Sequence, residues 1–206
     1  MTRVKICGIT SAEDAAAAVD AGADALGFVF VPGTPRYVAP DAAAEILAAM
    51  PPLVATVGVF VDRPLEEVLG IVSALGLHAV QLHGQEPAAY SRRMPVPVIR
   101  ALRVRDAESL RPLETYPAHA FLLDAYVEGR PGGTGTPIPL GLALRAKGRR
   151  PVILSGGLRP DTVAPAIRLV RPYGVDVSSG VEATPGRKDH RKVREFIVNV
   201  RQADLG

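Results

Sequence analysis

The sequence predicts an α/β protein folded as a single (β/α)8 TIM barrel over residues 1–206. Eight short apolar runs alternate with eight helix-like stretches from one end of the chain to the other, in units of roughly 25 residues. Strict alternation of strand and helix implies parallel strands joined by right-handed crossovers. Composition agrees, because 48% hydrophobic residues with only 5% aromatic ones favour aliphatic packing on both faces of a parallel sheet.

The eight expected strands are short runs rich in Val, Ile, Leu and Ala. They are Val4–Cys7, Leu26–Phe30, Ala55–Phe60, Ala79–Leu82, Val98–Ala101, Ala120–Leu123, Val152–Leu154 and Val175–Val177. An open doubly wound sheet is the alternative arrangement. That alternative calls for a Gly-x-Gly-x-x-Gly pattern after the first strand, and Cys7-Gly8-Ile9-Thr10 does not supply it.

Capping residues and prolines mark the expected helix starts. These marks are Thr10 with Glu13 as a capping box, Pro40, Asp62 before Pro64, Asp106 before Leu110, Pro160 with Asp161, and Asp189 before the apolar stripe of Val193, Phe196, Ile197 and Val200. The stretch from Tyr126 to Gly141 is too rich in Gly and Pro for a helix or strand. We expect a long loop there, able to close over a ligand.

Charge and composition limit the partners. The net charge is only +3 and the 24 Lys and Arg residues are dispersed, which disfavours nucleic-acid binding. A small anionic substrate would account for the bias, as would a solvated basic surface. The single cysteine allows no internal disulfide, the start of the chain lacks a secretory pattern, and no run reaches the ~18 apolar residues of a membrane span. We therefore expect a cytoplasmic protein without a membrane partner.

Residues just past each strand should converge on one mouth of a barrel, where such proteins carry their chemistry. They are Cys7, Pro35-Arg36-Tyr37, His83, Arg100, Asp124, Ser155-Gly156-Gly157 and Ser178-Ser179-Gly180. Side-chain alternation puts Lys5 and Cys7 on the same face of the first strand. A lone cysteine is either a small buried hydrophobe or a reactive thiol, and its position alone leaves both open. No His pair has the spacing of metal ligands, so we expect no metal site.

Two glycine-containing turns follow the last two strands. Ser155-Gly156-Gly157 and Ser178-Ser179-Gly180 occupy the place where barrels of this kind bind phosphate through backbone N–H groups. Each turn taken alone favours a tight connection, but two such turns after the last two strands favour a phosphate site. Arg36 offers a planar fork suited to a carboxylate. His83 is either a ligand contact or a solvated loop residue.

Several motifs, in order, resemble the phosphoribosylanthranilate isomerase family of tryptophan biosynthesis over essentially the whole chain. They are Lys5-Ile6-Cys7-Gly8-Ile9-Thr10, Gly27-Phe28-Val29-Phe30, Pro35-Arg36-Tyr37-Val38, Val80-Gln81-Leu82-His83-Gly84, Leu123-Asp124, Gly132-Gly133-Thr134-Gly135, Leu154-Ser155-Gly156-Gly157-Leu158 and Asp176-Val177-Ser178-Ser179-Gly180-Val181-Glu182. One departure is Thr136–Leu140, where many relatives have an aromatic-rich stretch.

The resemblance implies an aldose–ketose isomerase that performs an Amadori rearrangement of N-(5-phosphoribosyl)anthranilate without a cofactor, as a monomer or homodimer. Carried over by motif, Cys7 would be the general base and Asp124 the general acid. A thiol ordinarily titrates at about 8.5, so we expect activation by Lys5 or by the cationic Schiff base. The remaining implied contacts are Arg36 on the anthranilate carboxylate, Gly156, Gly157, Ser179 and Gly180 on the phosphate, and His83 and Asp176 on the substrate.

Three other functions compete with this interpretation. The histidine-pathway isomerase has an aspartate in the position of Cys7 and a second phosphate site that the motifs here do not provide. Indole-glycerol-phosphate synthase would need a longer N-terminal segment and catalytic lysines. A non-catalytic barrel that binds a phosphorylated ligand would need neither Cys7 nor Asp124.

Overall fold

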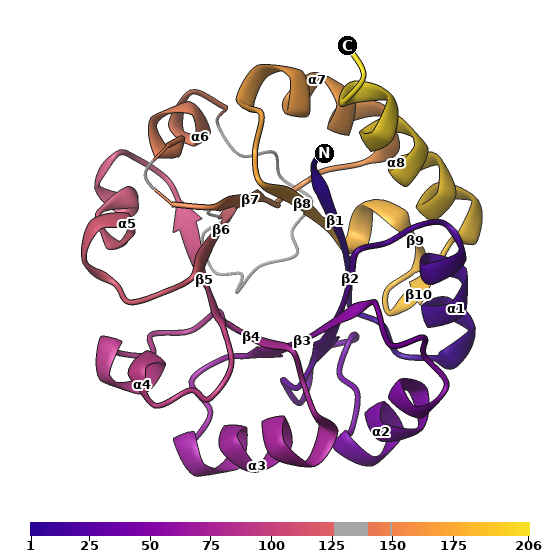
Figure 1. The fold of residues 1–206 in the computed structure, drawn as a ribbon, viewed down its shortest axis with the longest axis vertical. Coiled ribbons are helices and arrows are strands. Elements are labelled where there is room, and N and C mark those ends of the chain that lie inside the picture. The colour runs from indigo at the N-terminus through magenta and orange to yellow at the C-terminus, as the bar shows by residue number, and fades with distance from the viewer. Residues whose placement is uncertain (126–139, 149) are drawn as a thin grey trace.

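The computed structural model describes residues 1–125, 140–148 and 150–206. Eight parallel strands form a closed barrel, because β1 pairs with both β2 and β8 (Figure 1). Closure confirms the predicted (β/α)8 barrel and excludes the open sheet. The barrel strands are β1 (Arg3–Cys7), β2 (Ala25–Val29), β3 (Ala55–Phe60), β4 (Ala79–Leu82), β5 (Val98–Val104), β6 (Ala120–Ala125), β7 (Val152–Leu154) and β8 (Gly174–Val177).

All eight predicted strands are confirmed, and β5 and β6 are longer than expected. Their pairing continues from Ile99 opposite Ala120 to Val104 opposite Ala125. Every residue of β6 is buried, including the polar Asp124. The change from apolar to polar residues at Asp124 therefore does not mark the end of the strand. Asp124 therefore lies within β6 instead of just past it.

The helices surround the barrel as an outer ring (Figure 1). They are α1 (Ala12–Asp20), α2 (Pro40–Ala48), α3 (Leu65–Leu75), α4 (Ala88–Arg92), α5 (Pro112–Thr115), α6 (Leu140–Ala146), α7 (Pro160–Val170) and α8 (His190–Ala203), with short 3-10 turns η1 (Glu108–Leu110) and η2 (Ser179–Val181). An antiparallel pair, β9 (Glu182–Thr184) and β10 (Arg187–Lys188), follows η2.

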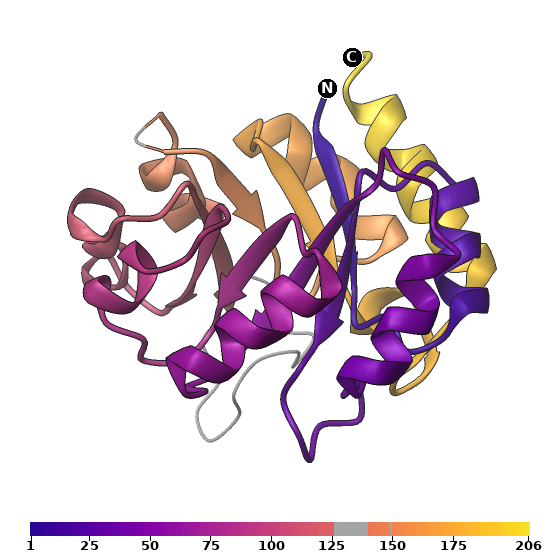
Figure 2. The same cartoon turned by 60° about the horizontal axis from the view of Figure 1, so that its bottom comes forward.

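Helix α8 shows why its sequence signal was reliable. The predicted cap, Asp189, accepts hydrogen bonds from the backbone N–H groups of Arg191 and Lys192. The apolar stripe predicted from the sequence is buried against the barrel, as expected for an amphipathic helix. Both termini lie at the same end of the barrel (Figure 2), where Thr2 donates two hydrogen bonds to the Asp204 carboxylate.

Two predicted caps are wrong because their side chains have distant partners. The cap of α1 is Ser11, which accepts from the backbone N–H of Asp14, whereas the Thr10 hydroxyl donates to the Gly186 carbonyl at 2.6 Å. Asp62 accepts from the backbone N–H of Gln85 and does not cap α3. The predicted helix near Asp106 is reduced to η1 and the four-residue α5.

Most of the loop predicted from Tyr126 to Gly141 lies outside the described residues, and its last two residues, Leu140 and Gly141, begin α6.

Inside the barrel, a small apolar cluster forms one layer of the core, made of Val57, Ile99, Ala101, Ala120, Leu122 and Ile153. The larger apolar core includes the buried residues of the strands and helices. Among the described residues, no helix combines the length and apolar character needed to cross a membrane.

Candidate active site

A cavity of about 410 Å³ opens at the C-terminal mouth of the barrel. It brings together eight of the nine residues predicted to form the site: Cys7, Arg36, His83, Asp124, Gly156, Gly157, Asp176 and Ser179. They come from six different strands or from the loops after them, so the fold alone collects them. The ninth, Gly180, does not line the cavity. Arg100 also points elsewhere, since its guanidinium donates to Glu86 and to the Gly84 carbonyl.

The thiol lies at the end of β1 against a glycine of the neighbouring strand. Cys7 is 7% exposed. A Cβ on Gly27 would lie 2.8 Å from the Cys7 Sγ and 3.0 Å from the Lys5 Nζ, closer than ordinary van der Waals contact. Glycine at this position in β2 therefore makes the room that the thiol and the ammonium occupy. It also confirms that Lys5 and Cys7 share one face of β1.

Lys5 is a buried cation held by two acceptors. Its Nζ donates to Asp176 Oδ1 at 2.6 Å and to Gln81 Oε1 at 3.0 Å. Burial disfavours the charge on Lys5, but Asp176 outweighs burial and raises the pKa of the ammonium above its ordinary value. Ser155 Oγ donates to the other carboxylate oxygen of Asp176 at 3.0 Å. The lysine is thus a fixed positive charge at the floor of the cavity.

Lys5 favours the thiolate of Cys7, as expected, but in the protein without ligand it does not outweigh burial. Burial raises the pKa of the Cys7 thiol above its ordinary value. The charge of Lys5 lowers that pKa, but the negative charge of Asp176 opposes Lys5. Burial and Asp176 together prevail, and they favour the neutral thiol.

Asp124 and His83 face each other across the cavity wall. Asp124 Oδ1 accepts from the backbone N–H of Ala125 at 2.9 Å, and its Oδ2 lies 3.5 Å from His83 Nε2. The other ring nitrogen of His83, Nδ1, lies 3.1 Å from Gln81 Nε2. Within the described part of the chain, His83 Nε2 is a buried nitrogen without a hydrogen-bond partner. Such a group favours a ligand contact over a solvated loop position for His83.

One edge of the Arg36 guanidinium forms an ion pair with Glu182. Its Nε and Nη2 donate to the two carboxylate oxygens of Glu182 at 2.8 and 2.7 Å, and Lys188 Nζ donates to Glu182 Oε1 at 3.0 Å. Burial alone would raise the pKa of Glu182, but Arg36 and Lys188 hold it below its ordinary value. A guanidinium has five N–H donors. Within residues 1–125, 140–148 and 150–206, the other three have no acceptor, so they can serve a ligand in the cavity.

The two glycine-containing turns pack against each other. Gly156 and Gly157 have φ angles of 73° and 64°, in the left-handed region that glycine adopts without steric cost. A Cβ on Gly180 would lie 1.9 Å from the Leu158 carbonyl oxygen, so the turn after β8 approaches the turn after β7 more closely than any side chain permits. Ser179 completes the cavity wall beside these turns.

Sequence reasoning assigned no role to Gln81, Glu182 and Lys188, which are all buried. Gln81 lines the cavity itself, whereas Glu182 and Lys188 contact Arg36 or each other. Gln81 lies in β4 two residues before His83, so side-chain alternation, which puts both on one face, could have indicated it. Glu182 ends the last family motif, so the resemblance could have indicated it, whereas Lys188 lies outside every motif. No group of three or more His, Cys, Asp or Glu side chains in residues 1–125, 140–148 and 150–206 is arranged to hold a metal ion.

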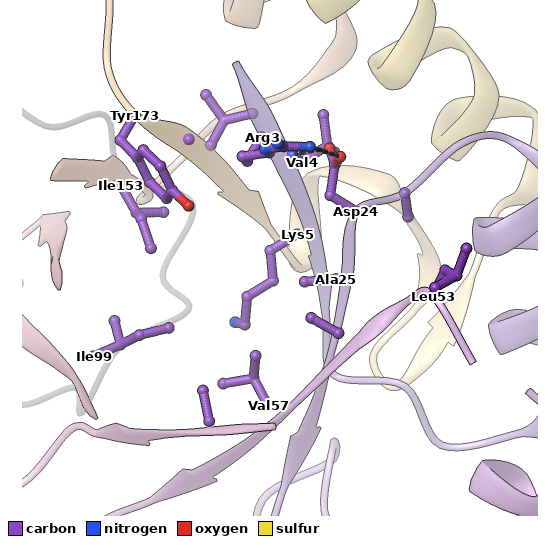
Figure 3. A pocket seen from close by; sticks show the side chains of 15 residues that line it. Arg3, Val4, Lys5, Asp24, Ala25, Leu53, Val57, Ile99, Ile153 and Tyr173 are labelled. Atoms are coloured by element: carbon purple, nitrogen blue, oxygen red, sulfur yellow. Dashed lines mark hydrogen bonds and ion pairs between the residues drawn. The ribbon is translucent and has the colours of Figure 1, made fainter. Parts of the chain in front are cut away.

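A second cavity, of about 420 Å³, opens at the N-terminal mouth (Figure 3). Small and aliphatic side chains form most of its wall, and Lys5 extends from β1 into the barrel interior beside Val57 (Figure 3). The charged pair at its rim, Arg3 and Asp24, is joined at 3.0 Å. Thiol, carboxyl, imidazole and phosphate-type turns meet only at the other mouth of the described structure, which makes that mouth the candidate active site.

The family model for N-(5'-phosphoribosyl)anthranilate (PRA) isomerase matches residues 4–199. The chain belongs to the phosphoribosylanthranilate isomerase family. A relative of that name from Pelobacter propionicus is 52% identical over 197 residues, which cover 96% of this chain and 94% of the relative. These matches confirm the family resemblance seen in the motifs.

Solved phosphoribosylanthranilate isomerases share the fold over nearly the whole chain. One, in complex with reduced 1-(o-carboxyphenylamino)-1-deoxyribulose 5-phosphate, has a TM-score of 0.89 and 44% identity, covering 98% of this chain and all of that one. Another, described as monomers generated from the dimeric isomerase of Thermotoga maritima, has a TM-score of 0.89 and 42% identity, with the same coverage. The family therefore includes a member with a phosphorylated ligand and a dimeric member.

Proposed function

We propose that the protein catalyses the phosphoribosylanthranilate isomerase reaction of tryptophan biosynthesis, with its chemistry at the C-terminal mouth. In this Amadori rearrangement, N-(5-phosphoribosyl)anthranilate becomes 1-(2-carboxyphenylamino)-1-deoxyribulose 5-phosphate. Family membership over residues 4–199 supports the reaction. The observation that carries the assignment to this mouth is the convergence of Cys7, Asp124 and Arg36 on one cavity with the glycine turns.

The cavity offers a separate site for each charged end of the substrate. Backbone N–H groups at Gly156, Gly157 and Ser179 would hold the phosphate, because glycine lets the backbone approach the phosphate oxygens. Gly180, which does not line the cavity, would act by letting its turn pack against the Leu158 carbonyl. The three free donors of Arg36 would hold the anthranilate carboxylate, while Glu182 keeps the guanidinium plane fixed. With both ends held, the ribose lies between Cys7 and Asp124.

Asp124 acts as the general acid in ring opening. Its protonated carboxyl gives a proton to the furanose oxygen, the bond between that oxygen and C1 breaks, and the nitrogen lone pair forms a cationic C=N bond to C1. The hydrogen bond from the Ala125 N–H to Oδ1 stabilises the carboxylate that remains. That bond fixes Oδ1 and leaves Oδ2 for the substrate.

Cys7 then acts as the general base on carbon. The thiolate removes the proton from C2, the C–H electron pair forms a C1=C2 bond, and the C=N electrons return to nitrogen. The resulting enolamine tautomerises to the ketone product. Burial favours the neutral thiol in the free protein, so the thiol must first release its proton to solvent. The cationic iminium formed by ring opening favours that release and the resulting thiolate.

His83 and Asp176 would contact the sugar hydroxyls. His83 Nε2 is buried at the cavity wall, and no partner for it is found in the described structure. Each carboxylate oxygen of Asp176 takes one donor, Lys5 or Ser155, and keeps a lone pair for a hydroxyl. The proposed reaction involves protons only and calls for neither a metal nor a cofactor. We further propose a cytoplasmic monomer or homodimer that acts on a small anionic substrate, without a nucleic-acid or membrane partner.

The test supplies phosphoribosylanthranilate and follows the loss of its fluorescence as it is converted. The control is the aminoimidazole substrate of the histidine-pathway isomerase, which undergoes the same rearrangement and carries two phosphates. We expect rapid conversion of the first compound and little of the second. Turnover of the histidine-pathway compound alone would refute the proposal.

A further inference from the structure

Gln81 links the buried lysine to the imidazole at the cavity wall. It lies in β4, is 2% exposed, and contacts Lys5 Nζ through Oε1 at 3.0 Å and His83 Nδ1 through Nε2 at 3.1 Å. Gln81 and His83 are two residues apart along the strand direction, so their side chains share one face. The catalytic scheme above does not use this amide.

The lysine decides which way the amide points. An ammonium group has three donors and no acceptor, so only the amide oxygen of Gln81 can face Lys5. The ion pair with Asp176 at 2.6 Å keeps Lys5 charged. The amide nitrogen must then face His83 and donate to Nδ1. An imidazole nitrogen that accepts a hydrogen bond carries no proton.

We propose that Gln81 is a positioning residue that fixes His83 as the tautomer with its proton on Nε2. The charge on Lys5 fixes the orientation of the Gln81 amide, and the amide fixes the tautomer of His83. That tautomer directs its Nε2–H into the cavity. Nε2 lies 3.5 Å from Asp124 Oδ2, a separation that a bound substrate can shorten to a hydrogen bond. The inference deepens the proposed function, on whose general acid it rests.

The N–H matters most after Asp124 has given up its proton. In ring opening, Asp124 changes from a neutral acid to a carboxylate, and the furanose oxygen becomes a hydroxyl. An Nε2–H beside Oδ2 stabilises that carboxylate, so it favours the transition state over the bound substrate. With the opposite tautomer, a bare nitrogen lone pair would face the new carboxylate and repel it. Loss of the correct tautomer should therefore lower kcat more than it raises KM.

Nitrogen-15 NMR of the imidazole rings in the free protein tests the tautomer without any substrate. The chain has four histidines, and a His83→Asn variant assigns the signal. We expect the Nε2–H form in the wild type, at a pH where the ring is neutral. A wild-type ring with its proton on Nδ1 would overturn the inference, whatever the enzyme's activity. Failure of the proposed function would instead appear as absent turnover with the Nε2–H form intact.

Two substitutions at Gln81 separate positioning from packing. Gln81→Glu keeps the shape but replaces the donor with an acceptor, so His83 should place a proton on Nδ1. Gln81→Met keeps most of the volume and removes both polar contacts, so both tautomers should appear. We expect kcat to fall at least about 10-fold in Gln81→Glu and less in Gln81→Met, with KM within about 3-fold of wild type.

Gln202→Glu is the matched control, because it makes the same change in charge at an exposed position of α8. It should leave both the tautomer and kcat unchanged. If Gln81→Glu is too unstable to study, the tautomer and kcat of Gln81→Met, together with the wild-type NMR spectrum, still test the role of Gln81. An Nε2–H ring retained in Gln81→Met, or a normal kcat alongside an altered tautomer, would contradict the proposed role.

Discussion

The two mouths of the barrel hold cavities of nearly equal volume, about 410 Å³ at the C-terminal mouth and about 420 Å³ at the N-terminal mouth. Their walls differ in chemistry. The N-terminal cavity is lined mainly by small and aliphatic side chains. Of its charged residues, Arg3 and Asp24 are paired with each other, and Lys5 is paired with Asp176. The C-terminal cavity contains a thiol, a carboxyl group and an imidazole nitrogen without a partner in the described structure. Size therefore does not identify the site, whereas convergent polar groups do.

The difference follows from the residue types that the barrel strands carry at their N-terminal and C-terminal ends. At the N-terminal mouth, alanines of β2, β3 and β4 line the cavity and give it no reactive group. Toward the C-terminal mouth, Lys5, Gln81 and Asp176 form a buried polar layer that supports Cys7 and His83. The N-terminal end of the barrel thus contributes to stability and the C-terminal end carries the reactive groups, as is general for (β/α)8 barrels.

The largest contrast is expected between two identical substitutions at opposite mouths. Asp124→Asn removes the proposed general acid, so kcat should fall by about 10²–10⁴-fold while the thermal midpoint of unfolding stays near wild type. Asp24→Asn weakens contacts to Arg3, Val4 and Arg201, so it should cost about 1–3 kcal/mol of stability and leave kcat near wild type. Turnover assays and thermal unfolding of both variants measure the contrast. Equal effects on kcat would abolish the distinction between the mouths.

A smaller effect is expected at the carboxylate site. Arg36→Lys keeps the positive charge but loses the fork that pairs with Glu182 and the donors proposed for the substrate. We expect kcat/KM to fall about 10- to 100-fold, mainly through KM, because the lost contacts bind substrate and transition state alike. The matched control is Arg3→Lys at the other mouth, which should keep wild-type kinetics. An unchanged KM in Arg36→Lys would remove Arg36 from the binding site.

The smallest of these effects is expected at the phosphate turns. Gly180→Ala places a methyl group against the Leu158 carbonyl oxygen, and the two turns must separate. We expect KM to rise about 3- to 10-fold and stability to fall by about 1–3 kcal/mol. Gly33→Ala, in another loop of the same cavity, meets no atom within 4 Å but has a φ of 80°. It should cost stability through backbone strain while preserving inorganic phosphate binding, measured by calorimetry.

The barrel itself could be predicted from the sequence because strand and helix signals are local and repeat eight times. The apolar runs of β3, β4 and β7 gave the observed strand bounds without change. The Asp189 cap and apolar stripe likewise defined α8. Prediction failed where a side chain had a distant partner, as with Thr10, whose hydroxyl bonds to Gly186 near the other end of the chain.

The candidate site could be assembled in outline but not in its electrostatics. Strand-end positions brought Cys7, His83 and Asp124 to one mouth, since parallel strands all end there. The neighbours that set their charge and tautomer could not be read in the same way. Asp176 lies 171 positions from Lys5, and only closure of β1 against β8 brings them together. Lys5 lowers the pKa of the Cys7 thiol, but burial together with the charge of Asp176 raises that pKa above its ordinary value.

Alkylation of Cys7, the only cysteine in the chain, tests whether this thiol performs the proton transfer. Because burial raises the pKa of the thiol in the free protein, its reaction with iodoacetamide should be slow at neutral pH. The rate should rise only above about pH 8.5, the ordinary range of a thiol. The urea-unfolded chain, which lacks that burial, should react at lower pH and serves as the control.

We predict that one carboxamidomethyl group per chain abolishes turnover in proportion to labelling, and that reduced 1-(o-carboxyphenylamino)-1-deoxyribulose 5-phosphate protects the thiol. The Gln81→Met variant retains Cys7, so its remaining turnover should also fall in proportion to the labelling of that thiol. A fully alkylated, folded protein that still converts phosphoribosylanthranilate at the wild-type rate would contradict the central claim that Cys7 performs the proton transfer.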